Sequence, residues 1–271
     1  IREWITPALP WTLAGIAILG TGILMGGAWA YESLSFGGFW AWDPVENASL
    51  VPWLTLVGGA HLLLINRRKP TSAFTTLLLI LSSFILVLYS TFLTRSGVLG
   101  DSSVHSFVDS GILAQLLVYL LFFVAVSTWM LMPKNPFRIA YLGACGILLL
   151  LALGNLITGK TVSEEEASKL LPGEGTWIPS LTLIFIGLSA AYLLIAYRRY
   201  FKSADEEEES VSSREFWMFM GSLVFILMSI HVTVVTSINV GNIFLSPFSE
   251  MFQWMHEHWN WEFAKRLADH Q

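Results

Sequence analysis

The chain has a single cysteine, Cys145, and only 13% of its 271 residues are charged. One cysteine excludes an intrachain disulfide, a paired-thiol redox motif and a Cys-x-x-Cys attachment motif. The 15 basic and 20 acidic residues give a net charge of -5 and form no basic patch, so no nucleic-acid partner is expected. What remains is a chain dominated by long uncharged stretches.

Hydrophobic residues make up 54% of the chain, with 12 Trp and 18 Phe, and this is more apolar surface than one soluble core can bury. Seven segments approach the ~20 apolar residues of a membrane span, and lipid leaves backbone groups no partner outside a helix. The sequence therefore predicts an all-α integral membrane protein, a bundle of about seven transmembrane helices. The expected spans are 11–31, 50–66, 74–93, 111–132, 139–157, 181–197 and 216–238.

Basic residues are distributed unevenly between the expected loops. If the N-terminus faces the cytoplasm, ten of the 15 Lys and Arg residues lie on that side, as the positive-inside rule requires. We therefore expect a multi-pass protein of the cytoplasmic (inner) membrane. The segment 36–53, the loop 94–110 and a Trp-rich amphipathic tail at 252–261 then lie on the outer, periplasmic side. Because the chain begins at Ile1 without a Met, we expect it to be part of a longer protein.

The segment 37–47 has the sequence GGFWAWDPVEN, between two apolar spans. It combines large aromatic faces, two carboxylates and two glycines, which suits a flat, hydrophobic, partly charged molecule such as a porphyrin. Trp also gathers at membrane interfaces without any further function. The order of Gly-Gly, two Trp at i and i+2, then Asp-Pro and Glu-Asn exceeds what an interfacial belt needs.

Three histidines are candidate ligands. His61 is the polar residue of an apolar run, VGGAHLL, so it is either an axial ligand of haem iron or hydrogen-bonded to a carbonyl of a neighbouring helix. His105 lies in an outer loop with Arg95, whose guanidinium suits a haem propionate; an exposed His beside a snorkelling Arg is the alternative. His231 lies inside a span and could pair with His61, or be structural.

Residues 37–49 resemble the tryptophan-rich WWD signature of the haem-handling proteins of cytochrome c biogenesis. The ending DPVENAS resembles the CcmF branch of that family, the cytochrome c haem lyase subunit. His61, the loop 94–107 and the SREF motif at 213–216 agree with it. The resemblance implies a WWD haem-handling core at 1–132 and, at 133–271, helices similar to the start of the CcmF C-terminal region.

The same resemblance implies two haem sites. A transient haem would rest on the WWD segment with His105 on its iron, and a resident b-type haem would use His61. Trp40 and Trp42 would flank the ring. The implied haem contacts are Gly37, Gly38, Trp40, Trp42, Asp43, Glu46, Asn47, Arg95, His61 and His105, with His61 and His105 as the metal ligands.

Asp43 and Glu46 should repel ionised propionates, so we expect these carboxylates to hold the loop. Arg95 and the Trp N–H groups would then meet the propionates.

The implied function is cytochrome c-type biogenesis, in which haem is positioned at the outer face for attachment to apocytochrome c. The expected partners are apocytochrome c, a haem chaperone, thiol-reducing maturation proteins and the lipid bilayer. Two alternatives stay open: a haem exporter, and a membrane scaffold that docks apocytochrome partners without binding haem.

Overall fold

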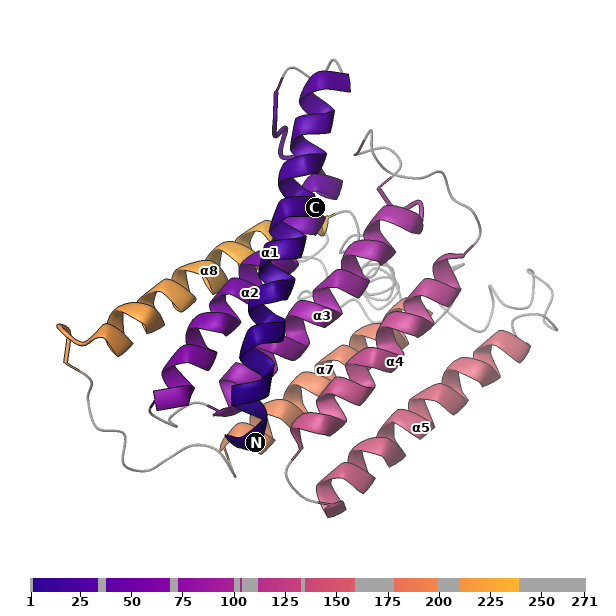
Figure 1. Ribbon diagram of the computed structural model, residues 1–271. Helices are drawn as coiled ribbons and strands as arrows, with labels where there is room; N and C mark the ends of the chain where they lie inside the picture. Colours follow the sequence, from indigo (N-terminus) through magenta and orange to yellow (C-terminus); the bar gives the residue numbers. More distant parts are fainter. Residues whose placement is uncertain are drawn as a thin grey trace, which may run out of the picture. The chain divides into compact units, whose positions relative to one another are not determined.

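The structure, a computed structural model, describes residues 2–33, 38–68, 73–99, 103, 112–132, 135–158, 178–198 and 210–238. Helices make up nearly all of this part of the chain, and no strand occurs in it (Figure 1). The prediction of an all-α fold is therefore confirmed. The helices are α1 (Arg2–Ser33), α2 (Pro44–Arg68), α3 (Ala73–Arg95), α4 (Leu113–Leu131), α5 (Asn135–Thr158), α7 (Ile178–Ala196) and α8 (Arg214–Thr236).

Each described helix lies at one of the seven predicted spans. Four of them, α1, α2, α3 and α8, are long and apolar enough to cross a membrane. Shorter apolar helices of 10–17 residues lie within α4, α5 and α7. The chain is a multi-pass membrane protein; the predicted amphipathic tail at 252–261 lies outside the described residues.

The largest differences from the predicted spans are the early starts of α1 and α2. The helix α1 begins at Arg2 and continues through Pro7 and Pro10, which transmembrane helices tolerate. The helix α2 begins at Pro44, because Pro is favoured at the first helical position after a capping residue. Its glycines and His61 do not interrupt α2, since each faces a neighbouring helix.

The helices fall into two units. Unit 1 contains α1 to α4 together with α8, and unit 2 contains α5 and α7. The first change of unit lies between Leu131 and Met132, and Tyr197–Ser237 returns to unit 1. Residues 197–237 belong to unit 1 because α8 packs against α2. The functional division at 132/133 stays a prediction.

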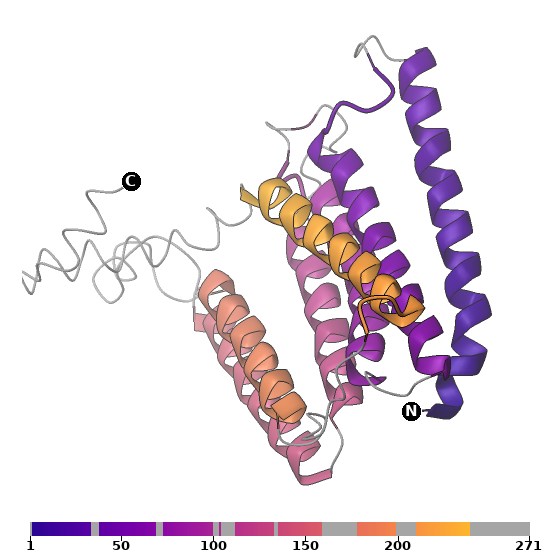
Figure 2. The ribbon, with the colours of Figure 1, turned by 90° about the vertical axis from the view of Figure 1, so that its left-hand side faces the viewer.

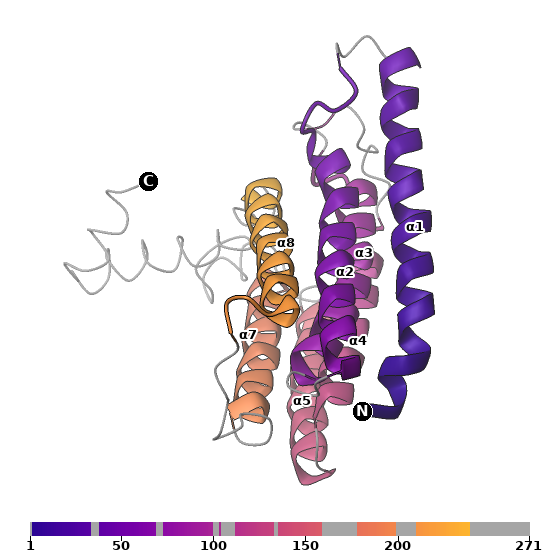
Figure 3. The same ribbon diagram turned by 60° about the vertical axis from the view of Figure 1, so that its left-hand side comes forward.

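In unit 1, α2 is the central helix. It contacts α8, α3 and α1, while α4 packs on α3. In Figure 3, α2 stands between α8 and α1. The most apolar stretch of α2 is 61% buried, whereas those of α1 and α8 are each only 17% buried. The segment that enters α2 is therefore attached to the most enclosed element of the unit.

Small polar residues join α8 to α2. Ser222, Ser229 and Thr236 recur every seven residues along α8 and are buried. Ser222 Oγ donates to the Gly58 carbonyl at 3.0 Å. The Ser229 and Thr55 hydroxyls are 2.7 Å apart. Small residues allow close approach of helices in lipid, and such hydroxyls hydrogen-bond across the interface.

Unit 2 is held by aromatic contacts between α5 and α7. Tyr141 is fully buried, and its hydroxyl lies 2.9 Å from Ser189 Oγ. The rings of Tyr141 and Phe137 pack on Tyr192 with centroids 5.3 and 5.0 Å away. A tyrosine buried in an apolar environment requires such a hydroxyl partner.

One tryptophan fastens α1 to α2. Trp53 Nε1 donates to the Ile16 carbonyl at 3.0 Å. A Cβ built on Gly20 would lie 2.7 Å from the same nitrogen, too close for any real contact. Glycine at position 20 therefore leaves the space in which the indole sits.

We expect Gly20→Ala to lower the free energy of unfolding by about 1–3 kcal/mol relative to Gly22→Ala, because the indole must shift and overpacking is costly. A Cβ at Gly22 meets nothing within 4 Å, so this variant is the matched control on the same helix. Thermal unfolding in detergent measures both. Equal stability of the two variants would contradict the role of Gly20.

Candidate functional site

The start of α2 is a capping box. Glu46 Oε2 accepts the Ala41 N–H at 2.9 Å and the Asp43 N–H at 3.3 Å. Asp43 Oδ1 accepts the Val45 N–H at 2.8 Å. Glu46, the third residue of the helix, thus accepts the backbone N–H of the capping residue Asp43, and the Asp43 side chain accepts an N–H of the first helical turn. These bonds hold the loop, the role that sequence analysis gave the two carboxylates; haem contact by them stays a prediction.

Trp42 stands in a left-handed backbone conformation, with φ of 57°. Bulky residues rarely adopt it, and such strain persists only where the surroundings over-determine it. Its carbonyl accepts a hydrogen bond from Asn47 Nδ2 at 3.0 Å, and the cap follows at the next residue. The Trp42 side chain remains 62% exposed and meets Trp40 edge to face at 6.3 Å. The cap therefore presents an indole outward.

A groove lies between α1 and the segment 38–43, which leads into α2. We call it the Trp40 groove; its volume is about 300 Å³. In Figure 2 the segment descends beside the end of α1 to the start of α2. The lining residues come from α1 on one wall and from the segment and α2 on the other: Leu19, Gly22, Ile23, Gly26, Gly27, Trp29, Ala30, Trp40, Val45, Glu46 and Ser49.

Glycines of α1 shape the groove. A Cβ on Gly27 would lie 2.6 Å from the Phe39 ring, so this glycine lets the segment pack on α1. Gly22 and Gly26 have nothing within 4 Å of a Cβ and leave the wall open. Sequence analysis missed this wall. The small-residue spacing Gly22-x-x-x-Gly26-Gly27 was the available signal, since it marks close approach to a helix.

Two polar atoms of the site are buried and have no hydrogen-bond partner within the described residues. They are Trp40 Nε1, whose residue lines the groove, and Asn47 Oδ1. A buried donor without a partner is costly, and a ligand acceptor would remove that cost. The Trp40 groove thus has an aromatic wall, and the indole N–H of Trp40 is a buried donor without a partner among the described residues.

The connection after α3 reaches the cap. Ser103 is buried, and its hydroxyl donates to Asp43 Oδ1 at 2.7 Å. Ser103 precedes His105 by two residues in the sequence, although His105 itself and Gly37 lie outside the described residues. Arg95 is the exposed last residue of α3. The contacts of Arg95 and His105 with haem remain predictions.

His61 lies on α2 where it meets α8. Its Nδ1 is 2.8 Å from the Val57 carbonyl, one turn earlier on the same helix rather than on a neighbouring one. Because a carbonyl only accepts, Nδ1 carries a proton, and in the neutral ring Nε2 then carries the lone pair. The ring packs on Phe225 at 5.7 Å, and a Cβ on Gly221 would lie 3.6 Å from Nε2. The bond at Nδ1 thus leaves Nε2, which faces Gly221 of α8, as the nitrogen for any metal contact.

His231 does not pair with His61. The contacts of His61 on α8 are ten and six residues before His231, and ten helical residues span about 15 Å. His231 is also exposed, whereas the face of α8 toward α2 carries Ser229 and Val232. No cluster of three or more His, Cys, Asp or Glu side chains occurs among the described residues.

The sequence is similar to known proteins of cytochrome c biogenesis. Residues 3–100, which include α1, the WWD segment, α2 and α3, match the family model of the cytochrome C assembly protein. The cytochrome c-type biogenesis protein CcmF of Escherichia coli (strain K12) is 50% identical over 100 residues, 37% of this chain. The chain belongs to the cytochrome c assembly family.

Other relatives match a larger part of the chain. CcmF of Pseudomonas fluorescens is 42% identical over 127 residues, 46% of the chain and 19% of the relative. The biogenesis protein ccl1 of Rhodobacter capsulatus is 38% identical over 182 residues, 67% of the chain and 27% of the relative. The chain spans 15% of the E. coli protein. No solved structure matches.

We expect Glu46→Ala to lower the free energy of unfolding by about 1–2 kcal/mol, because two backbone donors lose their acceptor. Hydrogen exchange at the amides of Ala41 and Asp43 should accelerate with it. Glu46→Gln is the control, since its side-chain oxygen accepts the same two bonds. If Glu46→Ala and Glu46→Gln exchange at the same rate, the capping box does not hold the segment.

Proposed function

We propose that the chain acts in cytochrome c-type biogenesis by holding haem in the Trp40 groove, on the periplasmic side of the inner membrane. The observation that supports this most is Trp42, which the cap keeps in a strained conformation with most of its indole exposed beside the groove. Strain of this kind collects at ligand sites. An exposed aromatic face next to an apolar wall suits a flat porphyrin.

The groove volume fits partial enclosure. Ligand sites that bury most of a drug-sized molecule measure about 300–1,000 Å³, and this groove, at about 300 Å³, is at the lower limit. One edge of the macrocycle would enter between α1 and Trp40 while the opposite edge stays outside. Partial enclosure suits a molecule that must react with a second protein.

Charges and donors favour a fixed orientation of haem. Glu46 and Asp43 point their oxygens at backbone N–H groups, so their charge is partly satisfied within the loop. Trp40 Nε1 is the buried donor that a propionate oxygen would engage. Arg95 would supply the second propionate contact through its planar fork of donors. Gly37 and Gly38 would allow the backbone to approach the ring.

His105 and His61 are the proposed iron ligands. His105 follows Ser103 by two residues in the sequence, and the Ser103 hydroxyl is bonded to Asp43 of the cap. His61 would hold a resident b-type haem through Nε2, with Nδ1 fixed by Val57. Gly221 and Phe225 of α8 would border that second site.

The chemistry of attachment belongs to haem and to the thiols of apocytochrome c, since bound haem supplies the vinyl groups that the thiols attack. The chain itself would orient the ring and exclude water from its buried edge. In this proposal it is a haem lyase component that receives haem from a chaperone and meets apocytochrome c and thiol-reducing proteins.

We expect Gly26→Leu to weaken haem binding by about tenfold or more, because the new side chain fills the groove. Gly143→Leu is the matched control: Gly143, like Gly26, meets nothing within 4 Å of a Cβ, but it lies on α5. Haem titration monitored by the Soret band measures both.

Unchanged binding in Gly26→Leu, or in a variant with Trp40→Ala, Trp42→Ala and His105→Ala combined, would remove the groove from the proposal. Absence of a Soret band in anaerobically purified protein would instead favour a docking scaffold. A haem-loaded protein without attachment activity in the assembled complex would favour a haem exporter.

For the resident haem, we expect His61→Ala to abolish a low-spin b-type spectrum, since the iron loses its Nε2 ligand. His231→Ala is the matched control, because this histidine is exposed on α8 away from His61. Absorption spectra of the reduced full-length proteins give the answer. A retained low-spin spectrum in His61→Ala would rule this histidine out as a ligand.

A further inference from the structure

A second cavity lies at the end of unit 1 where α2 ends and α8 begins, opposite to the WWD segment along α2. Its volume is about 510 Å³, and its lining contains three arginines and two apolar residues: Leu64, Arg67, Arg68, Arg214 and Met218. The cavity shares no residue with the Trp40 groove. Neither of the two proposed haem sites uses it.

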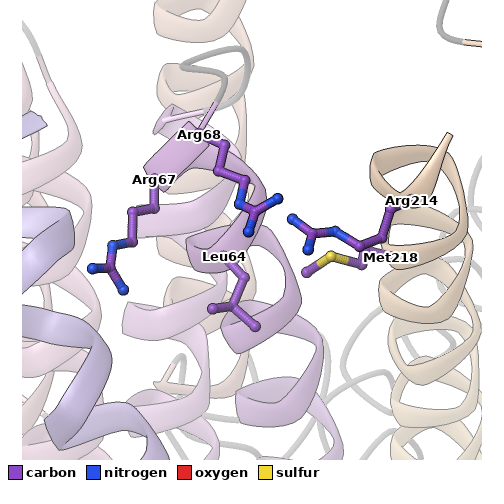
Figure 4. Close-up of a pocket in the computed structure, with 5 residues that line it drawn as sticks. All are labelled: Leu64, Arg67, Arg68, Arg214 and Met218. Atoms are coloured by element: carbon purple, nitrogen blue, oxygen red, sulfur yellow. The ribbon is translucent and has the colours of Figure 1, made fainter.

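The side chains converge from two helices. In Figure 4, Arg68 of α2 and Arg214 of α8 extend toward each other, with Met218 between the helices and Leu64 on the wall of α2. Arg67 projects to the other side of α2. The cavity is thus charged where the two guanidinium groups meet and apolar below them.

Facing guanidinium groups repel each other unless an anion lies between them. Arg214 Nη2 forms an ion pair with its neighbour Glu215 Oε1 at 3.5 Å, which leaves further donors of its fork available. The N-terminal end of α8 adds a partial positive charge to the same place. Arginine binds phosphate bidentately, so two opposed arginines suit one phosphate group.

The position in the fold decides where the phosphate would come from. Arg68 is the last residue and Arg214 the first residue of two helices that are long and apolar enough to span the bilayer. Such residues lie at the depth of lipid headgroups. Leu64 and Met218, one turn further into each helix, are at the depth of the acyl chains. Basic pockets between transmembrane helices are known to bind anionic headgroups.

We propose that this cavity binds a phosphate ester, supplied in the membrane by the headgroup of an anionic phospholipid. The phosphate lies between Arg68 and Arg214, and an acyl chain follows Leu64 and Met218. Because its two arginines belong to different helices, the lipid joins the end of α2 to the start of α8. This proposal does not rest on haem binding.

The test uses the full chain, purified in nonionic detergent and stripped of lipid. Native mass spectrometry measures the binding of phosphatidylglycerol, of phosphatidylcholine and of inorganic phosphate. We expect phosphatidylglycerol to bind tightest. We expect Arg68→Gln and Arg214→Gln each to weaken its binding about fivefold, and the double variant about 25-fold, from roughly 1 kcal/mol per arginine.

Two variants guard against a general loss of structure or charge. Glu215→Gln removes the competing carboxylate, so phosphatidylglycerol should bind as tightly or more tightly. Arg138→Gln removes one arginine from α5, in unit 2, and should leave binding unchanged. Phosphatidylglycerol should also raise the melting temperature of the original chain more than that of the double variant.

Undiminished phosphatidylglycerol binding in the double variant would overturn the site. Equal binding of phosphatidylcholine would overturn the selectivity for an anionic headgroup. Binding of inorganic phosphate that requires both arginines, without binding of phosphatidylglycerol, would keep the phosphate site and overturn the lipid as its source.

Discussion

The carboxylate of Glu46 is the contact on which the outer part of unit 1 depends. It receives two backbone N–H groups, from Ala41 and Asp43, and so fixes the direction in which the chain enters α2. That direction sets Trp42 in its strained conformation and turns Trp40 into the groove beside α1. A loop without this internal acceptor would lose its shape, because each unpaired donor favours rearrangement. The acidic residues of the WWD segment therefore bind the backbone, and the indole of Trp42 is left exposed.

The sequence was sufficient to predict the helices, but it did not predict which helices pack against each other. Long apolar runs predicted a helix at each described span, since lipid permits little else. The start of α2 was placed too late, because hydrophobicity does not register the cap at Asp43 and Pro44. The pairing of α8 with α2 was not predictable, because serines and glycines permit close approach to any helix. The return of residues 197–237 to unit 1 was likewise not predictable, because it depends on the contacts of α8 with α2.

For the candidate site, too, the sequence predicted local features but not the contribution of another helix. The pattern GGFWAWDPVEN located the Trp segment and the capping role of its carboxylates, since both are local features of the chain. The opposite wall, with Gly22 and Gly26, comes from another helix and carries no chemistry-bearing side chain. For His61, the chemistry was predicted, but its bond to Val57 on its own helix was found only in the structure.

The seam between α2 and α8 also has a consequence for how the protein is made. The hydroxyl pair of Thr55 and Ser229 is separated by 174 positions in the chain, so α2 enters the bilayer long before its partner is synthesised. Until then its glycines and polar groups face lipid or a provisional neighbour, and contacts of such high sequence separation form late. Assembly of this bundle thus includes an interval in which the helix carrying His61 is inserted but not yet enclosed, and membrane quality control would encounter it in that state.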